Sequence, residues 1–286
     1  MNSDLDQCNG AKVFEDFKSV MEASIDCSSQ NVSVISLMGN GLMTIAFEPS
    51  CYGCLEELYL NGNELTSLPD ELLLCTKLRV LNVIANKLSI LPKNFGNLLN
   101  LQEFHADENA LTELPDSFEC LARLRVAELS NNKLRELPSN LQGLVALNTL
   151  NVSSNKLSKI PDSLGEIETL TLVDVSNNFI AVLPETCRSK AVIKMLNVEC
   201  NTLTYLPEWV NGMASIEELI TRSNPIEGTP LTSAFGEISV KLRNFDAAGN
   251  YMKGTWTWAV LTCNIGLIVV CEIPDHVFPD LCWLCL

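Results

Sequence analysis

The sequence has few basic residues and only two histidines. Its 286 residues include 19 Lys and Arg against 35 Asp and Glu, which gives a formal net charge of −16 at pH 7. A chain of this charge repels phosphate backbones and anionic lipid headgroups, so we expect no nucleic-acid partner. The two histidines, His105 and His276, leave little scope for a histidine metal site or for histidine-dependent catalysis.

Targeting and membrane signals are also lacking. Met1 to Asp6 is acidic where a secretory signal would be basic, and no apolar stretch follows it. The apolar stretch 256–271 has 16 residues, whereas a helix needs about 20 to span a bilayer. We therefore expect a cytoplasmic chain, with the nucleus as a second possibility, and no spanning segment.

No catalytic motif stands out either. The sequence contains no phosphate-binding glycine loop, nucleophile elbow or kinase signature. His105 lies near Glu103, Asp107 and Glu128, but on an open surface these groups favour hydrogen bonding over catalysis or metal binding. We expect a chain that is not an enzyme and that needs no cofactor and no metal.

Two CxxC pairs, Cys51 with Cys54 and Cys282 with Cys285, would together supply four thiolates for zinc. The repeats described below would hold the two pairs some 40 Å or more apart, because they are separated by nearly ten strands at about 4.8 Å each. Cys51 and Cys54 are therefore expected to be inert thiols that pack in the first repeat.

What the sequence does have is a repeat of 23 residues. Asparagines recur at this spacing, each within a version of LxxLxLxxNxL such as Leu55 to Leu65 or Leu147 to Leu157. A degenerate copy, 242–252, follows after 26 residues and brings the array to about ten repeats. The nine asparagines are Asn40, Asn63, Asn86, Asn109, Asn132, Asn155, Asn178, Asn201 and Asn224.

Each position of the repeat has a physical role. The two leucines of LxL point inward from a short strand and the residue between them points outward. Successive strands pair in parallel, one per turn. The asparagine ends the strand, where a buried amide can satisfy backbone groups that the turn leaves unpaired. We therefore expect a ladder of stacked asparagine amides.

The second half of the repeat reads Leu-x-x-Leu-Pro and then a residue of a helix-capping type, namely Asp70, Asp116, Ser139 or Asp162. Apolar residues three apart follow, such as Phe95 and Leu98, which suits about one turn of helix on the outer side. The predicted fold is an α/β solenoid, a curved leucine-rich-repeat horseshoe with a parallel concave sheet and short convex helices or turns.

The ends of the array need covers, because a single turn cannot bury its own leucines. Residues 1–31 are predicted to cap the start through an amphipathic helix over Ala11 to Ser24, although this helix could instead dock a partner. The repeats occupy residues 32–252. The tail 253–286 is predicted to be an irregular apolar cap; an altered tail from splicing or a gene-model error comes second, and membrane contact third.

These residues resemble the cytosolic leucine-rich-repeat proteins of the 23-residue LxxLP type, over about Val32 to Met252. That group includes the Ras-binding scaffold proteins, the plant intracellular Ras-group proteins and the repeat domains of Scribble and Erbin. The resemblance implies binding of proteins in signalling, scaffolding or polarity complexes, and it does not identify the partner.

Side chains that point outward from the strands are free for recognition. Early in the array they are apolar, and in the middle they are acidic or polar, which favours a protein partner with a basic surface. The function predicted is an intracellular signalling scaffold whose partner is of the small-GTPase or phosphatase type. The alternative is a regulatory subunit of a phosphatase or another signalling enzyme. The predicted binding residues are Tyr59, Val80, Asn82, Ile84, Glu103, His105, Asp107, Glu128, Asn151, Asp174 and Asn197.

Overall fold

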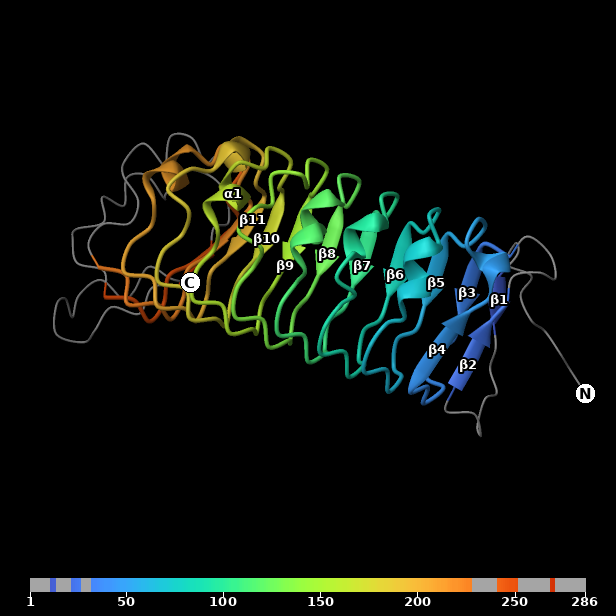
Figure 1. The fold of residues 1–286 in the computed structure, drawn as a ribbon. Coiled ribbons are helices and arrows are strands. Elements are labelled where there is room, and N and C mark those ends of the chain that lie inside the picture. Colours follow the sequence, from blue (N-terminus) through green and yellow to red (C-terminus); the bar gives the residue numbers. More distant parts are fainter. Residues whose placement is uncertain (1–10, 14–21, 27–31, 228–240, 252–267, 271–286) are drawn as a thin grey trace, which may run out of the picture.

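A computed structural model of the chain describes residues 11–13, 22–26, 32–227, 241–251 and 268–270. In these residues the chain coils into turns that stack side by side along one axis (Figure 1). The fold is the predicted leucine-rich-repeat solenoid. None of the described helices is long and apolar enough to cross a membrane.

One side of the coil is a parallel sheet of 12 strands, each contributed by one turn. Paired residues of neighbouring strands are 23 apart in sequence, as Val34 and Glu57 are. This spacing holds as far as Glu218, which pairs with Asn244. The strands in order are β1 (Ala11–Val13), β3 (Val34–Ser36), β5 (Glu57–Tyr59), β6 (Val80–Asn82), β7 (Glu103–His105), β8 (Val126–Glu128), β9 (Thr149–Asn151), β10 (Leu172–Asp174), β11 (Met195–Asn197), β12 (Glu218–Ile220), β13 (Asn244–Asp246) and β14 (Ile268–Val270).

The opposite side of the coil carries short helices, and all but one of those described are 3-10 helices. They are η1 (Pro49–Cys51), η2 (Asp70–Leu74), η3 (Phe95–Asn97), η4 (Asp116–Cys120), α1 (Asp162–Gly165), η5 (Arg188–Ala191) and η6 (Glu208–Gly212). Strands β2 (Glu22–Ile25) and β4 (Thr44–Phe47) form a separate parallel pair near the start.

The predicted capping role of Asp70, Asp116, Ser139 and Asp162 is wrong. Each of the three helices in question begins with its aspartate, and the proline before it, in extended conformation, is the capping residue. No side-chain capping bond forms at these three helices, and no helix follows Ser139. The aspartates lie in the first turn of each helix, where the positive end of the peptide dipoles stabilises their negative charge.

The core is a continuous column of apolar side chains between the sheet and the helices. In β5 the burial alternates, with Leu58 buried between the half-exposed Glu57 and Tyr59, and β3 and β6 to β13 likewise bury their middle residue. Phe95, Phe104 and Phe118 form a buried cluster with ring centroids 4.9 to 6.3 Å apart. Close aromatic packing of this kind joins two successive turns.

The repeated asparagines lie one above another where the strands end. The side-chain amide of Asn86 donates to the carbonyls of Leu60 (2.9 Å) and Val83 (3.0 Å) and accepts from the amide of Leu65 (3.0 Å). Equivalent bonds recur from Asn63 to Asn224, and Asn250 of the degenerate copy donates to two carbonyls in the same way. Asn40, the first of the series, donates to the Met38 carbonyl of its own turn at 3.1 Å.

The residue before each of these asparagines has left-handed backbone geometry. Glycine fills the position at Gly39, Gly62 and Gly249. At the seven other turns a residue with a side chain adopts φ of 52° to 55° there; these residues are Ala85, Glu108, Asn131, Ser154, Asn177, Cys200 and Ser223. The turn that brings the asparagine inward therefore dictates this backbone at every repeat, whatever the side chain.

The start of the chain differs from the prediction of a helix over Ala11 to Ser24. Ala11–Val13 pairs with β3 at the repeat spacing, and Glu22–Ile25 pairs with β4. Most of the predicted tail, 253–286, lies outside the described residues, but β14 within it extends the sheet beyond β13. Both described ends of the sheet therefore carry an additional strand.

Cys51 also departs from the prediction that it is an inert thiol. It is disulfide-bonded, whereas Cys54 is a free thiol. Burial raises the pKa of Cys54 and also raises the pKa of the buried Cys75 thiol to about 12. These two thiols are therefore protonated at neutral pH and are poor nucleophiles.

Candidate protein-binding surface

The face of the sheet that points away from the core and the helices presents three parallel rows of side chains. The rows form because alternate residues of each strand point away from the core. The first row is Val34, Glu57, Val80, Glu103, Val126, Thr149, Leu172, Met195, Glu218 and Asn244. The second row is Ser36, Tyr59, Asn82, His105, Glu128, Asn151, Asp174, Asn197, Ile220 and Asp246. The third row, two residues further on, is Met38, Asn61, Ile84, Asp107, Ser130, Ser153, Ser176, Glu199, Arg222 and Ala248.

All 11 predicted binding residues lie on this face. Val80 and Glu103 are in the first row, Ile84 and Asp107 are in the third, and the rest are in the second. The second row is continuous from Tyr59 to Asn197, so it joins seven successive strands.

Sequence reasoning missed much of the first row. Val126, Leu172 and Met195 are half-buried apolar side chains on the same face as Val80, interrupted toward the start by Glu57 and Glu103. The sequence does indicate that these residues share a face with Val80, because each of them stands a multiple of 23 positions after it and so occupies the same position of the repeat. Apolar side chains therefore alternate with polar ones in the first row, beside the mainly polar second row.

Several second-row side chains are held in place by the backbone of their own turn. The side-chain oxygens of Asn82, Asn151, Asp174 and Asn197 each accept the amide of the residue two positions later, at 2.9 to 3.1 Å. Such bonds close a local turn and fix the side chain. These residues thus have a structural role, and the same bonds orient their remaining polar atoms on the face.

Neighbouring second-row residues also contact each other. The Asn197 amide donates to Asp174 Oδ2 at 3.0 Å, and the Asn151 side chain is hydrogen-bonded to the Glu128 carboxyl. Burial raises the pKa of Glu128, an effect that the bond to Asn151 partly offsets. Two pairs of neighbouring second-row residues are therefore linked, in each case an amide to a carboxylate.

The surroundings of His105 fit surface hydrogen bonding. Its Nε2 lies 3.4 Å from Glu103 Oε2, and Asp107 instead accepts the Ser130 amide (3.0 Å) and hydroxyl (2.7 Å) of the next turn. Among the described residues no group of three or more His, Cys, Asp or Glu is placed to hold a metal ion.

Tyr59 stands where the apolar start of the face meets the acidic part. Its hydroxyl donates to Glu57 Oε2 at 2.9 Å. Burial, that hydrogen bond and the charges of Glu57 and Glu103 raise the pKa of Tyr59 to about 12. The phenol therefore stays neutral at physiological pH and offers both an apolar ring and a polar tip to a partner.

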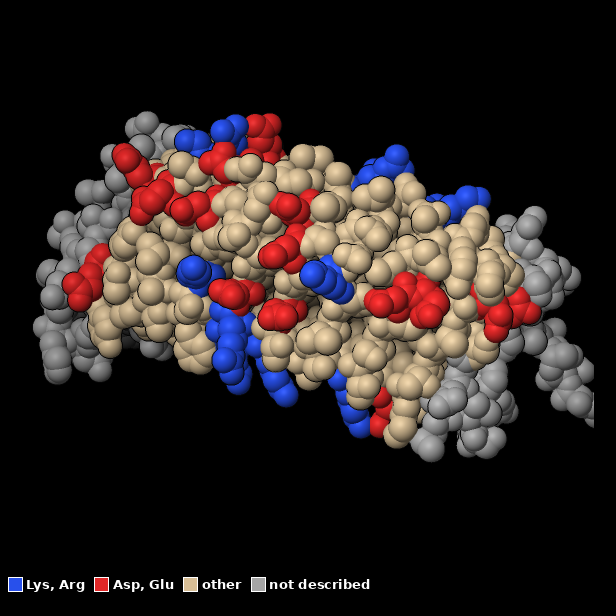
Figure 2. Space-filling model, in the orientation of Figure 1, with Lys and Arg blue, Asp and Glu red and all other residues tan. Residues whose placement is uncertain are grey.

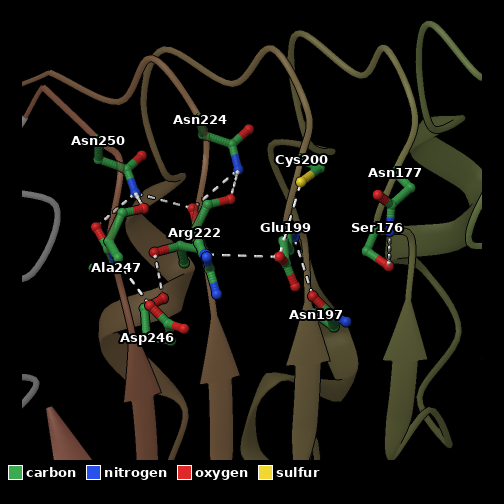
Figure 3. A network of polar contacts seen from close by, with 12 residues as sticks. Ser176, Asn177, Asn197, Glu199, Cys200, Arg222, Asn224, Asp246, Ala247 and Asn250 are labelled. Atoms are coloured by element: carbon green, nitrogen blue, oxygen red, sulfur yellow. Dashed lines mark hydrogen bonds and ion pairs between the residues drawn. The ribbon is translucent and has the colours of Figure 1, made fainter. Parts of the chain in front are cut away.

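Acidic residues dominate the charge of the three rows. Arg222 is the one Lys or Arg in them, and its Nε lies 3.9 Å from Glu199 Oε1 of the preceding turn (Figure 3). The side of the molecule drawn in Figure 2 carries acidic side chains along its middle, and its Lys and Arg lie mostly near the upper and lower margins. A positively charged partner is attracted to the acidic residues of the three rows.

Comparison with known proteins supports the repeat assignment. The sequence profile of the Leucine Rich Repeat family matches residues 54–75 and 146–167. The functional domain of InlJ from Listeria monocytogenes superposes with a TM-score of 0.67 at 19% identity, over 85% of this chain and 54% of that one. The fold is that of a leucine-rich-repeat protein.

Two plant receptor structures are similar too. The ectodomain of the Arabidopsis thaliana receptor kinase GASSHO1/SCHENGEN3, solved with CASPARIAN STRIP INTEGRITY FACTOR 2, gives a TM-score of 0.66 at 21% identity over 81% of this chain. The plant peptide hormone receptor RGFR1, in complex with RGF2, gives 0.65 at 23% identity over 81%. The chain spans 32% and 42% of these two receptors, respectively. No functionally characterised protein sequence matches the chain significantly.

Proposed function

We propose that this leucine-rich-repeat protein is a non-enzymatic scaffold that binds a protein partner on the outer face of its sheet. The observation that carries the proposal is that the apolar first-row side chains of Val80, Val126, Leu172 and Met195 stand beside a mainly acidic and amide second row that spans seven strands. Apolar side chains supply the buried contact area of an interface, and fixed polar groups beside them supply orientation and specificity.

The setting proposed for this activity is intracellular signalling, with a partner of the small-GTPase or phosphatase type that presents a basic surface. The support is the acidic character of the second and third rows, which speeds association with basic proteins. Solenoids present extended faces of this kind to their partners. The receptor structures named above contain bound ligands, which accords with a protein or peptide partner.

Affinity purification with matched variants tests the proposal. A face variant, Val80→Glu with Leu172→Glu, places charge in the first row. A control variant, Leu99→Glu with Val145→Glu, changes side chains that are 60% and 62% exposed outside the three rows. Partners quantified by mass spectrometry should be lost with the face variant and kept with the control. Equal recovery with both folded variants would count against the proposal.

The same eluate separates scaffold from regulatory subunit. Phosphatase activity that co-purifies with the wild-type chain and is lost with the face variant would support the alternative that the chain regulates a phosphatase. Turnover by the isolated chain would contradict the proposal that it is not an enzyme.

A cytoplasmic location, with the nucleus second, is also proposed. Five described cysteines are free thiols, which accords with a reducing compartment, whereas the disulfide at Cys51 accords with an oxidising one. Fractionation combined with thiol labelling in intact cells decides between them. A labelled, reduced Cys51 in the cytosolic fraction supports the proposal, and an oxidised Cys51 in a secretory fraction contradicts it.

A further inference from the structure

Basic side chains gather at the edge of the sheet where β6, β7 and β8 begin, in a chain whose net charge is −16. Arg79 and Arg125 immediately precede β6 and β8, and Lys77 and Arg123 stand two residues before them. All four side chains are exposed. We refer to these four residues as the basic edge patch.

Backbone bonds fix the arrangement of the patch. The Gln102 amide donates to the Arg79 carbonyl (2.8 Å), and the Arg125 amide donates to the Gln102 carbonyl (2.7 Å). The two arginines are therefore two turns apart, or about 10 Å at the usual strand spacing. Lys77 and Arg123 are separated by the same two turns.

An open cavity of about 300 Å³ lies within the patch, lined by Glu56, Lys77, Arg79, Asn100, Gln102 and Arg123. The Asn100 side chain is fixed between the Thr76 carbonyl, to which it donates (2.7 Å), and Arg123 Nη1, from which it accepts (2.5 Å). Glu56 is the one acid in the lining, and its Oε2 lies 3.2 Å from Arg79 Nη1. The lining thus carries net positive charge with amide donors at its centre.

The repeats provide an internal comparison for this patch. The positions of Lys77 and Arg79 are occupied by Cys54 and Glu56 one turn earlier, and the positions of Arg123 and Arg125 by Ala146 and Asn148 one turn later. The core does not dictate these residues, because the basic ones are exposed. The same pair recurs as Lys241 and Arg243 before β13, and Lys194 stands at the Arg79 position before β11. What marks the basic edge patch is that two such pairs lie only two turns apart.

We propose that the basic edge patch binds a compact anion that carries several phosphate groups, of the inositol-polyphosphate class, either free or as the headgroup of a lipid. Guanidinium groups bind phosphate oxygens in pairs of charge-assisted hydrogen bonds. The backbones of the two arginines are about 10 Å apart, so a ring that carries several phosphates spans the patch and can contact all four side chains. The patch lies beside the three rows and does not depend on what they bind.

Calorimetric titration of the full chain with inositol hexakisphosphate tests the proposal. Saturable binding that weakens as salt is raised is expected for the wild type. In the variant Arg79→Gln with Arg123→Gln, affinity should fall about tenfold or more, because two charged hydrogen-bond donors are lost. Lys133→Gln with Arg135→Gln removes the same charge beyond the other end of the strands and should change affinity by less than about twofold.

Vesicles distinguish the two sources of the ligand. If the protein sediments with phosphatidylcholine vesicles that contain a phosphoinositide, and not with vesicles of phosphatidylcholine alone, the ligand is the lipid headgroup. If the protein binds inositol hexakisphosphate in the titration but neither kind of vesicle, the ligand is the soluble compound. No binding of either probe, or equal weakening in both double variants, would overturn the proposal. If the Arg79 and Arg123 variant does not give a wild-type circular dichroism spectrum, Lys77→Gln at an exposed position provides the same comparison.

Discussion

The left-handed residue before each ladder asparagine is the clearest case in which the turn, and not the residue type, sets the backbone. Glycine adopts positive φ without cost, whereas Ala85 and Ser154 adopt φ of 53° with a side chain present. The repeat period predicts where this position falls, but the variety of its occupants hides its geometry in the sequence. Each non-glycine occupant holds a small strain that substitution can reveal.

Ala85→Gly should stabilise the protein by about 1 kcal/mol, because it relieves the strain of a left-handed alanine. Gly62→Ala, the same position one turn earlier at φ of 71°, should destabilise it by a similar amount. Urea unfolding followed by circular dichroism measures both changes. Destabilisation by both substitutions would mean that the added chain freedom of glycine outweighs the strain.

Asn132→Ala should lower the free energy of unfolding by about 3 kcal/mol, since it leaves buried backbone groups without partners. Its side chain donates to the Ala106 and Leu129 carbonyls (2.9 and 3.1 Å) and accepts from the Leu111 amide (2.9 Å). The exposed Asn97→Ala is the control and should have little effect. Equal effects from the two substitutions would show that the asparagine ladder does not stabilise the fold.

Glu128→Gln should stabilise the protein at pH 7 but not near pH 3. Burial raises the pKa of Glu128 in the folded state, so the folded state keeps its proton to higher pH than the unfolded state does. Stability from this group is therefore complete below the unfolded pKa and is lost as pH rises through the folded pKa. Urea unfolding at several pH values measures the difference. A constant offset between variant and wild type at all pH values would contradict this assignment.

At the scale of elements, the repeat period predicted the strands well and the chain start poorly. Apolar spacing in Val13, Phe14 and Phe17 suits a helix, and the sequence offers no sign that β3 leaves an edge with unpaired backbone groups. Ala11–Val13 pairs with that edge, which satisfies its hydrogen bonds. Tertiary pairing therefore overrode local periodicity, and the three-residue strand gives too short a pattern to recognise.

The helices of neighbouring turns approach so closely that small residues are required between them. A Cβ added at Gly165 in α1 would lie 2.0 Å from the Thr186 carbonyl oxygen, and one at Gly96 in η3 would lie 1.9 Å from that of Ser117. The sequence marks these positions only as isolated glycines, and their necessity follows from the distance between turns.

Gly165→Ala should therefore destabilise the protein by roughly 2 kcal/mol or more, because α1 and the backbone around Thr186 must separate to admit a methyl group. Gly53→Ala is the matched control, since a Cβ there meets no atom within 4 Å. Thermal unfolding of the two variants gives the comparison. An equal melting temperature for both would show that the turns can move apart at no cost.

At the scale of the whole molecule, each turn contacts its neighbours, so stability adds along the array and depends on its ends. The inward leucines were predictable because the core requires them at every turn. The binding face was predictable only in position, since the side chains of Val126, Leu172 and Met195 are not dictated by the repeat. Their significance emerged from the register that aligns them with Val80.

Removing residues 1–31 should cause self-association, because it exposes the edge of β3 and removes the cover over Val32 and Ile35, which are 3% and 2% exposed. Removing residues 1–10 leaves β1 and β2 in place and should give the oligomeric state and dye binding of the full chain. Light scattering and binding of a hydrophobic dye measure both. A monomeric chain from residue 32 onward would show that the first turn needs no cover.

The constant register of the ladder bears on how such a chain can change in length. Joining Glu108 directly to Asn132 would remove one whole unit, and it would still place an asparagine after a residue with φ of 55°. The asparagine at the new joint keeps the spacing of the ladder, so loss of a unit shortens the sheet by one strand without interrupting the row of amides. Whole units are therefore the natural step by which a chain of this kind changes the breadth of its contact surface.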